Sequence, residues 1–369
     1  MAMFWADDFS SYGIGGQTKM LDGNYAELAE GDLFSPSPTL VADPDPMGAG
    51  YAVARQYCEY HAYGAGYPAA DPYLRIVFPS SLDEVGGSIK LWLSALPSAI
   101  ETSFSIVFAD SGNDAQLSFN ITPLGAFRVY RGHYRSTVLG TSVPILTPNA
   151  WHHIEWKVTA SNSGGTVEIR VNGTAVISLT GQDTVAQTEL SYSTMSFVGT
   201  GGDSNASALY AYYKDLILWD TTGSENNDFM GPTYIARKTV TADTSFTWTP
   251  STGSAGWSLI NEKGPSDSTY ISDGWPAAAE SYFAMENLPA DVTSVRGIML
   301  MGRMRKSDGG DCNVQMGVDD GTSTTWGADR AITTAYTYWH DILELNNTTA
   351  SPFTPTEFNA LNFVIKRTA

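Results

Sequence analysis

The stretch of residues 151–181 constrains the fold of this chain more than any other part of its sequence. Apolar and charged side chains alternate over residues 167–171, so Val167, Ile169 and Val171 share one face of a strand. The pair Asn172-Gly173 follows, and it favours the positive φ angles of a type I′ hairpin turn. An Asn-Ser-Gly-Gly turn lies before the alternating run. The stretch therefore predicts three antiparallel strands in succession, as in an all-β domain.

Composition agrees with β-sandwiches. The 369 residues exceed what one hydrophobic core usually organises, so two domains are expected. The chain has 35 Gly and 18 Pro, 12% aromatic residues and only 16% charged residues. Turn formers and aromatic residues in such numbers favour sheets joined by tight turns over helical bundles.

Further strand-like runs precede and follow residues 151–181 at the spacing of an all-β domain. They cover residues 51–61, 73–78, 87–95, 102–109, 115–122, 126–131, 136–143, 194–199 and 208–219. The last run is apolar or aromatic on both faces, which predicts a central strand that is covered on both sides. Residues 220–228 are polar and turn-rich, and they predict a boundary between a domain of residues 1–231 and one of residues 232–369.

The second part repeats the pattern on a smaller scale. Strands are expected at residues 232–240, 246–250, 258–262, 268–272, 281–288, 292–304, 312–318, 331–334, 336–344 and 361–367. Thr354 can cap a helix, with Pro355 at its first position and Glu357 three residues after the cap. One short helical turn is therefore expected before the last strand, and the predicted fold is a jelly-roll sandwich followed by a smaller β-sandwich.

Charge and cysteine content exclude several classes of protein. A formal net charge of −19 repels nucleic acid and anionic membrane surfaces. No segment approaches the ~20 apolar residues of a membrane span, and Asp7 and Asp8 lie where a signal peptide needs basic residues. Cys58 and Cys312 fall in different predicted domains, so no disulfide is expected. We expect synthesis in a cytoplasm and no membrane insertion.

The residues of common enzyme sites do not converge in this sequence. A glucanase of the sandwich type places two carboxylates on one strand face, whereas Glu155 and Glu168 stand alone as outward-facing residues of alternating strands. His152 and His153 point to opposite faces of one strand, so they cannot share a metal. Zinc and nucleophile motifs are absent as well. These patterns predict that the chain is not an enzyme and needs no cofactor.

Three loops are expected to be ordinary turns formed by Asn, Asp and Gly, and calcium binding is the alternative at each of them. The loops contain Asp110, Asn113 and Asp114; Asp203 and Asn205; and Asp319, Asp320 and Gly321. Aromatic residues in loops are candidates for stacking on sugar rings. The predicted glycan-binding residues are Tyr63 and Tyr67, which lie near Tyr60, and Trp275, each with burial in a core as its alternative.

Two resemblances carry further expectations. The patterns W-H-H-I-E-W-K-V, V-E-I-R-V-N-G-T and Y-Y-K-D-L-I-L-W-D resemble the laminin-G-like, concanavalin A-like lectin and glucanase sandwich, over about residues 1–230. The whole chain also resembles virion structural proteins of tailed bacteriophages. That resemblance rests on N-D-F-M-G-P at 227–232, W-T-P-S at 248–251, D-S-T-Y-I-S at 267–272 and F-T-P-T-E-F-N-A-L-N-F at 353–363.

The phage resemblance implies a non-enzymatic virion protein of the tail, baseplate or a fibre, whose lectin-like domain recognises a glycan or receptor on the host surface. The alternatives are a capsid or tail decoration (cement) protein with a purely structural role and, weakest for want of a carboxylate pair, a glycan-cleaving depolymerase. The implied partners are other virion proteins, and the implied location is the virion. Assembly by symmetry implies a homo-oligomer, and analogy implies a trimer.

Overall fold

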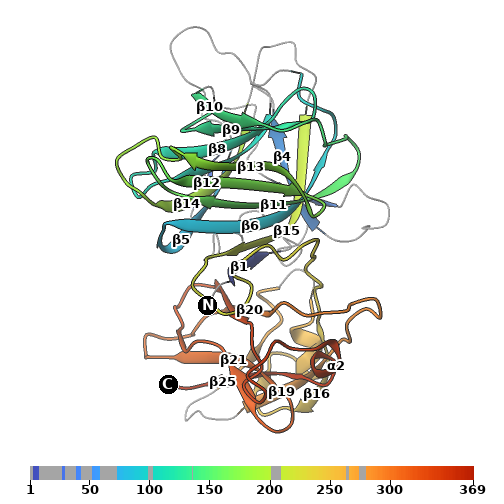
Figure 1. Ribbon diagram of the computed structural model, residues 1–369. Helices are drawn as coiled ribbons and strands as arrows, with labels where there is room; N and C mark the ends of the chain where they lie inside the picture. The colour runs from blue at the N-terminus through green and yellow to red at the C-terminus, as the bar shows by residue number, and fades with distance from the viewer. Residues whose placement is uncertain are drawn as a thin grey trace. The chain divides into compact units, whose positions relative to one another are not determined.

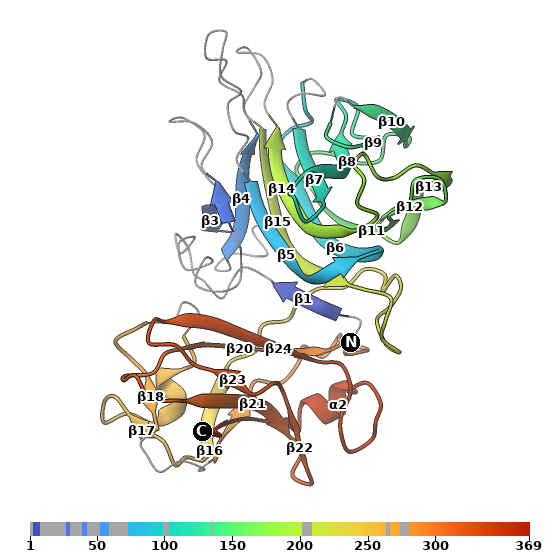
Figure 2. The same ribbon diagram turned by 90° about the vertical axis from the view of Figure 1, so that its left-hand side faces the viewer.

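A computed structural model describes residues 3–7, 27–29, 39–42, 52–58, 73–98, 103–134, 136–200, 209–262, 266–273 and 280–369. Contacts divide these residues into two compact units, with the division between Ile235 and Ala236. Both units are built almost wholly from antiparallel strands (Figures 1 and 2). No helix of the described ranges has the length and apolar character needed to cross a membrane.

The first unit consists of two sheets, here named A and B. Sheet A has the order β13 (Thr174–Gln182), β12 (Gly165–Val171), β11 (Trp151–Thr159), β6 (Glu84–Leu93), β15 (Leu209–Trp219), β4 (Ala52–Cys58) and β3 (Thr39–Ala42), with β1 (Met3–Asp7) also paired to β15. Sheet B has the order β10 (Thr137–Thr141), β9 (Phe127–Arg131), β8 (Ala115–Ile121), β7 (Ser103–Ala109), β14 (Tyr192–Thr200), β5 (Tyr73–Leu82) and β2 (Glu27–Ala29). Sheet A faces the viewer in Figure 1.

The core lies between the inner faces of the two sheets. Sheet A contributes Trp156 and Tyr213 and sheet B contributes Phe108 and Phe197, all of them fully buried. The stretch of residues 151–181 forms β11, β12 and β13, as predicted. Its hairpin turn has φ of 50° at Asn172 and 82° at Gly173, the backbone of a type I′ turn.

The run at residues 208–219 is the central strand β15, paired with β6 on one side and with β4 and β1 on the other. Leu216, Leu218 and Trp219 are fully buried, so the prediction of a strand covered on both faces is confirmed for the C-terminal part of β15, whereas Tyr210, Tyr212 and Lys214 are only half-buried on the outer face. The other strand predictions between residues 51 and 200 are also confirmed, with ends that shift by a few residues.

The second unit has one larger sheet and two strand pairs. The larger sheet has the order β16 (Val240–Ser245), β19 (Glu280–Met285), β25 (Asn362–Arg367), β21 (Asn313–Asp319) and β22 (Thr324–Trp326), with β23 (Arg330–Ala331) beside β21. The pairs are β17 (Thr249–Pro250) with β18 (Ile271–Ser272), and β20 (Ile298–Met304) with β24 (Thr337–Leu343). Phe283 of the sheet and Leu300 of β20 belong to one buried cluster, so this unit is a smaller sandwich.

The predicted helical turn is α2 (Pro355–Phe358). The Glu357 amide donates to Thr354 Oγ1 (3.2 Å), and the Thr354 amide donates to Glu357 Oε2 (2.7 Å), so the capping box is complete. The chain is thus all-β, a concanavalin A-like jelly-roll sandwich followed by a smaller β-sandwich.

Two strand predictions are wrong. Residues 232–239 form no strand, because backbone amides of this segment donate to side chains of sheet A. Residues 258–259 are the second half of the 3₁₀ helix η3 (Gly256–Leu259), and residues 260–262 follow it without forming a strand. There the Asp243 carboxylate accepts hydrogen bonds from the amides of Gly256 (2.9 Å) and Trp257 (2.7 Å), which bends the chain.

Candidate functional site

The outer face of sheet B is polar where β7, β8 and β9 lie side by side. The register pairs Ser105 with Asn120, and Asn120 with Arg128. Two residues away on each strand, and on the same face, Ser118 is paired with Tyr130. Directly opposite residues of an antiparallel sheet have Cβ atoms about 4.5–5.5 Å apart, so these side chains form one continuous tract.

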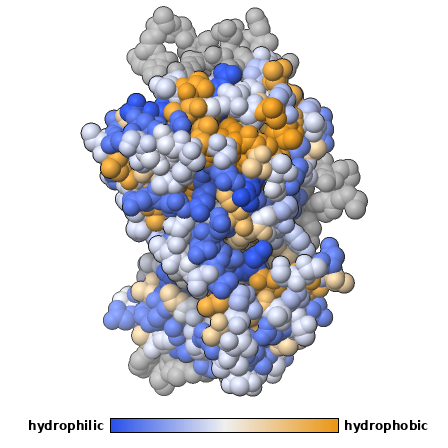
Figure 3. All heavy atoms as spheres, in the orientation of Figure 1, coloured by the Kyte–Doolittle hydropathy of each residue, from blue (hydrophilic) through white to orange (hydrophobic). Residues whose placement is uncertain are grey.

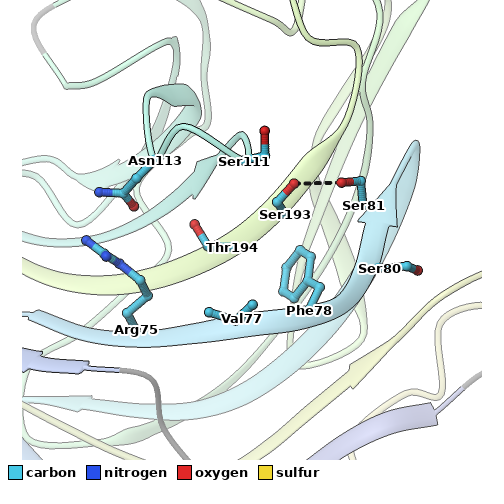
Figure 4. A pocket seen from close by; sticks show the side chains of 9 residues that line it. All are labelled: Arg75, Val77, Phe78, Ser80, Ser81, Ser111, Asn113, Ser193 and Thr194. Carbon is cyan, nitrogen blue, oxygen red and sulfur yellow. Dashed lines mark hydrogen bonds between the residues drawn. The ribbon is translucent and has the colours of Figure 1, made fainter.

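A hollow of about 510 Å³ lies beside this tract, where β5 and β14 curve around it (Figure 4). Arg75 extends from β5 toward Asn113 and Thr194, and the hydroxyls of Ser81 and Ser193 hydrogen bond to each other across the hollow (2.8 Å). The full lining is Arg75, Val77, Phe78, Ser80, Ser81, Ser111, Asn113, Ser193 and Thr194. A space with such a lining suits a ligand that offers many hydroxyl groups.

Several buried polar atoms on this face have no hydrogen-bond partner in the described part of the chain. They are Oδ1 and Nδ2 of Asn120, Oγ of Ser105 and Oγ1 of Thr194, on residues that are 1%, 0% and 8% exposed. Ser118 differs, because its hydroxyl donates to the Gly132 carbonyl (2.8 Å). An unpartnered buried polar group costs about 1–3 kcal/mol, so this face keeps a polar interior at a cost in stability.

The electrostatics of this face differ from those of the whole chain. None of the 39 acidic residues lies between Ala115 and Ile154, although the chain carries a net charge of −19. The same stretch contains Arg128, which is half-buried on the outer face and whose Nε donates to Thr141 Oγ1 (3.2 Å). This acid-free stretch is the sequence signal that could have pointed to sheet B. Alternation alone gave no reason to prefer one face over another.

Two carboxylates lie next to Ser111, which lines the hollow, and both accept hydrogen bonds. Asp110 accepts from the Asp114 amide (2.9 Å) and from Gln116 Nε2 (2.9 Å). Glu189 accepts from the hydroxyl (2.7 Å) and the amide (3.2 Å) of Ser111. These hydrogen bonds, chiefly that of the Ser111 hydroxyl, lower the pKa of Glu189.

The loops kept as calcium candidates behave as turns where they are described. The Asn113 amide donates to the Asp110 carbonyl (3.0 Å), and Asp320 Oδ1 accepts from the amides of Thr322 and Ser323 (both 2.8 Å) within the β21–β22 turn. The prediction of a hairpin turn at Asp319-Asp320-Gly321 is confirmed. No group of three or more potential metal-ligating His, Cys, Asp or Glu side chains is found among the described residues.

A second cluster of ionisable groups lies on the outer face of sheet A, under residues 228–235, here named the junction segment. Glu155 is fully buried, and its Oε1 accepts from the amides of Met230 (3.0 Å) and Gly231 (2.9 Å). The expectation that Glu155 is an exposed strand residue is therefore wrong. Burial raises the pKa of Glu155, and the two amide hydrogen bonds oppose this rise.

Other contacts extend this attachment along the segment. His153 Nε2 accepts from the Thr233 amide (3.4 Å), and Asp215 Oδ1 accepts from the Ile235 amide (3.3 Å). Burial, with a smaller effect of the Lys90 charge, lowers the pKa of His153 to about 4. Lys90 Nζ lies 3.0 Å from Asp215 Oδ2. Arg170 stacks on the Phe229 ring, with Cζ 3.7 Å from its centroid. The ionisable groups of this cluster are thus engaged by the chain itself.

Other predicted features have the following outcomes. His152 bonds to Thr147 through Nε2, on the side of β11 opposite His153, as expected. Tyr63, Tyr67 and Trp275, the predicted glycan-binding residues, lie outside the described residues, as do Tyr60, Asp203 and Asn205. Cys312 is a free cysteine, and the side chain of Cys58 lies outside the description.

No protein-family model matches the sequence, and no curated protein sequence matches it either. Solved structures do match. Alginate lyase Aly36B is 18% identical, over 58% of this chain and 95% of that chain, with a TM-score of 0.38. An endo-β-1,4-glucuronan lyase from the fungus Trichoderma reesei is 10% identical, over 59% and 95%, with a TM-score of 0.41. The carbohydrate binding module CBM66 from Bacillus subtilis is 9% identical, over 50% and 92%, with a TM-score of 0.30.

These likenesses concern the fold, and they correct two expectations from the sequence. The structures named above are polysaccharide lyases and a sugar-binding module, and none of them is a phage protein. The exclusion of enzymes, and with it the prediction of a non-enzymatic function, is therefore wrong as drawn from this type of fold. It rested on the missing glucanase carboxylates, whereas the lyases show that this type of sandwich also occurs in glycan-cleaving proteins of another reaction class. The resemblance to phage proteins, the virion location and the trimer stay predictions.

Proposed function

We propose that the first unit binds an acidic polysaccharide along the outer face of sheet B, from the hollow at Arg75 to the tract at Arg128. The observation that carries this proposal is the hollow, whose lining presents the guanidinium of Arg75, the amide of Asn113 and several serine and threonine hydroxyls. A polysaccharide offers hydroxyl groups at regular intervals, and each can donate and accept a hydrogen bond.

The charges of the face support an acidic ligand over a neutral one. Guanidinium groups bind carboxylates through two parallel hydrogen bonds. Arg75 and Arg128 lie on this face within a chain of net charge −19, whose overall field repels polyanions elsewhere. Binding is therefore expected to be local to this face and to weaken as salt is added.

Affinity electrophoresis and calorimetry with the full chain test the proposal, with a polyuronate (alginate) and a neutral polymer (dextran) as probes. Arg75→Gln is expected to weaken alginate binding at least about ten-fold, or about 1.4 kcal/mol. Arg305→Gln, at an exposed arginine of the second unit, is the matched control and is expected to bind like the wild type. Alginate binding that is absent, or that Arg75→Gln leaves unchanged, contradicts the proposal.

Cleavage of the bound chain is a second candidate function, and the position of Tyr130 favours it. Tyr130 is on the outer face of β9, where only 3% of it is exposed, two residues from Arg128, whose partner across the strands is Asn120. A guanidinium and an amide can hold a uronate carboxylate, which acidifies the neighbouring C5–H bond. A deprotonated tyrosine oxygen can then take the C5 proton. The C4=C5 double bond forms as the C4–O4 bond breaks, and O4 leaves with its electron pair and takes that proton back from the tyrosine, which returns to its deprotonated form.

Turnover tests this reaction, because each elimination creates an unsaturated product that absorbs ultraviolet light. Tyr130→Phe is expected to lower the turnover of a polyuronate at least about 100-fold, the usual contribution of a positioned acid or base, while binding is kept. Tyr270→Phe, at an exposed tyrosine of the second unit, is the control. Equal turnover by Tyr130→Phe and the wild type would remove Tyr130 from the reaction.

A further inference from the structure

Four aromatic side chains gather on the outer face of sheet A, away from the hollow of sheet B. The register aligns Trp151 with Trp92, and Trp92 with Tyr212, in one row across β11, β6 and β15. Tyr210 follows two residues before Tyr212 on the same face. Strands lie about 4.8 Å apart, so the three-strand row extends for about 10 Å.

These rings are not part of the core. Tyr213, between Tyr212 and Lys214, points inward and is fully buried, whereas all four residues of the outer row are half-buried. Trp92 and Tyr212 meet edge to face with centroids 5.0 Å apart, and Tyr210 lies 6.4 Å from Tyr212. The rings therefore hold one another in place, and part of each is left accessible.

Two lysines lie next to the row, and one of them, Lys90, is paired with Asp215. Lys214 Nζ lies 4.4 Å from the centroid of the Trp151 ring, and Lys90 lies in the neighbouring row between His153 and Lys214. The junction segment covers His153 and Glu155 further along β11, beyond the aromatic row. Figure 3 shows the side of the first unit that sheet A faces, where patches of hydrophobic residues alternate with hydrophilic ones.

From these observations we infer that the row of Trp151, Trp92, Tyr212 and Tyr210 is a second polysaccharide-binding surface, which holds sugar rings by stacking. The C–H groups of a sugar ring form an apolar face that packs against an aromatic ring, and half-buried aromatic residues on a sheet lose little conformational entropy on binding. The ligand class, a polysaccharide, is that of the proposed function. The surface, however, selects ring faces rather than carboxylates.

Two surfaces on opposite sheets have a measurable consequence. A long polymer that contacts both binds with an avidity above that of either surface, provided that its length spans the two. A short oligosaccharide engages one surface at a time. Binding of short neutral oligosaccharides is therefore a property of the aromatic row alone.

The test uses the full chain with a neutral cello-oligosaccharide and a short alginate oligosaccharide as probes, monitored by tryptophan fluorescence and calorimetry. Trp92→Ala and Tyr212→Ala are expected to weaken neutral-probe binding at least ten-fold and to leave alginate-probe binding unchanged. Arg75→Gln is expected to do the reverse. Trp92→Phe, which keeps an aromatic face, is expected to recover part of the affinity. Tyr270→Ala serves as a control at an exposed ring of the second unit.

Unfolding midpoints of all variants separate a loss of binding from a loss of structure. The inference is overturned if the neutral probe does not bind to the wild type, or if it binds equally well to a folded Trp92→Ala variant. Alginate binding that depends on Arg75 in that same experiment leaves the proposed function intact. If the neutral probe binds and its binding depends on Trp92, while alginate does not bind, the inference about the aromatic row holds and the proposed function fails.

Discussion

At the scale of single residues, Glu155 shows what an alternating pattern predicts and what it does not. Alternation correctly placed Glu155 on the face of β11 opposite Trp156. It did not predict burial, because the amides that cover this carboxylate come from residues 75 and 76 positions further along the chain. Local periodicity carries no information about a contact at such a separation. The same limit applies to Ser105 and Asn120, whose importance depends on the register of β7 with β8.

Removing the Glu155 carboxylate is expected to destabilise the first unit. Glu155→Ala leaves the amides of Met230 and Gly231 without an acceptor, while it also removes a buried charge that is costly to desolvate. We expect a net loss of about 1–3 kcal/mol in the free energy of unfolding by urea. Glu168→Ala, which removes a half-buried partner of Arg170 on the neighbouring strand, is the control and is expected to cost less than about 1 kcal/mol.

His153 gives the first unit a pH-dependent stability. Its pKa is lowered from 6.5 to about 4, so between these values the unfolded chain binds a proton that the folded chain does not. The contribution is present above pH 6.5 and is lost as the pH falls toward 4, by about 2–3 kcal/mol. Glu155, whose pKa is raised by burial, has the opposite sign just above its ordinary pKa.

Urea unfolding between pH 4 and 7 measures this effect. His153→Gln is expected to flatten the decrease in stability on acidification, whereas His133→Gln, at an exposed histidine, is expected to keep the slope of the wild type. Equal slopes for the wild type and His153→Gln would show that His153 titrates alike in the folded and unfolded chains.

At the scale of elements, strands were predictable wherever apolar and polar residues alternate between turn signals. That covers most of the first unit and the β19, β21 and β25 strands of the second. The errors lie where side chains compete for backbone amides. The segment after Gly231 resembles a strand, but its amides are bound by His153 and Asp215, and Asp243 does the same at the start of η3. Such competition depends on tertiary structure and has no local signature.

The turn between β12 and β13 requires glycine for its backbone alone. Gly173 has φ of 82°, and a Cβ there would meet only Pro232 Cδ, at an ordinary 3.5 Å, among its nearer neighbours. Gly173→Ala is expected to lower the free energy of unfolding by about 1–2 kcal/mol through backbone strain. Gly253→Ala is the control, since nothing lies within 4 Å of its added Cβ and its φ is not in the left-handed region. Thermal or urea unfolding distinguishes the two.

At the scale of the whole molecule, the junction segment belongs with the first unit. Its amides, the Phe229 ring and the buried Met230 side chain all contact sheet A. Composition gave two domains and a polar stretch between them. It could not show that the residues just after that stretch pack onto the sandwich, since neither charge nor periodicity marks them.

Truncation tests this assignment. A chain that ends at residue 235 is expected to fold with its junction segment in place, whereas a chain that ends at residue 227 is expected to unfold at lower urea. The shorter chain loses the contacts of Phe229 and Met230 and exposes Glu155 to water. Glu155→Ala is accordingly expected to cost less in the shorter chain than in the longer one. Equal stability of the two truncated chains would contradict the role of the segment.

The junction segment also has a consequence for exchange between proteins. Glu155, His153 and Asp215 bind main-chain amides, which every residue except proline possesses. Apart from the Phe229 ring, the buried Met230 side chain and the positive φ of 74° at Gly231, the attachment thus places few demands on the side chains of the segment. A chimera that joins a foreign domain after Ile235 would keep every one of these bonds, so this sandwich is suited to carry interchangeable C-terminal modules.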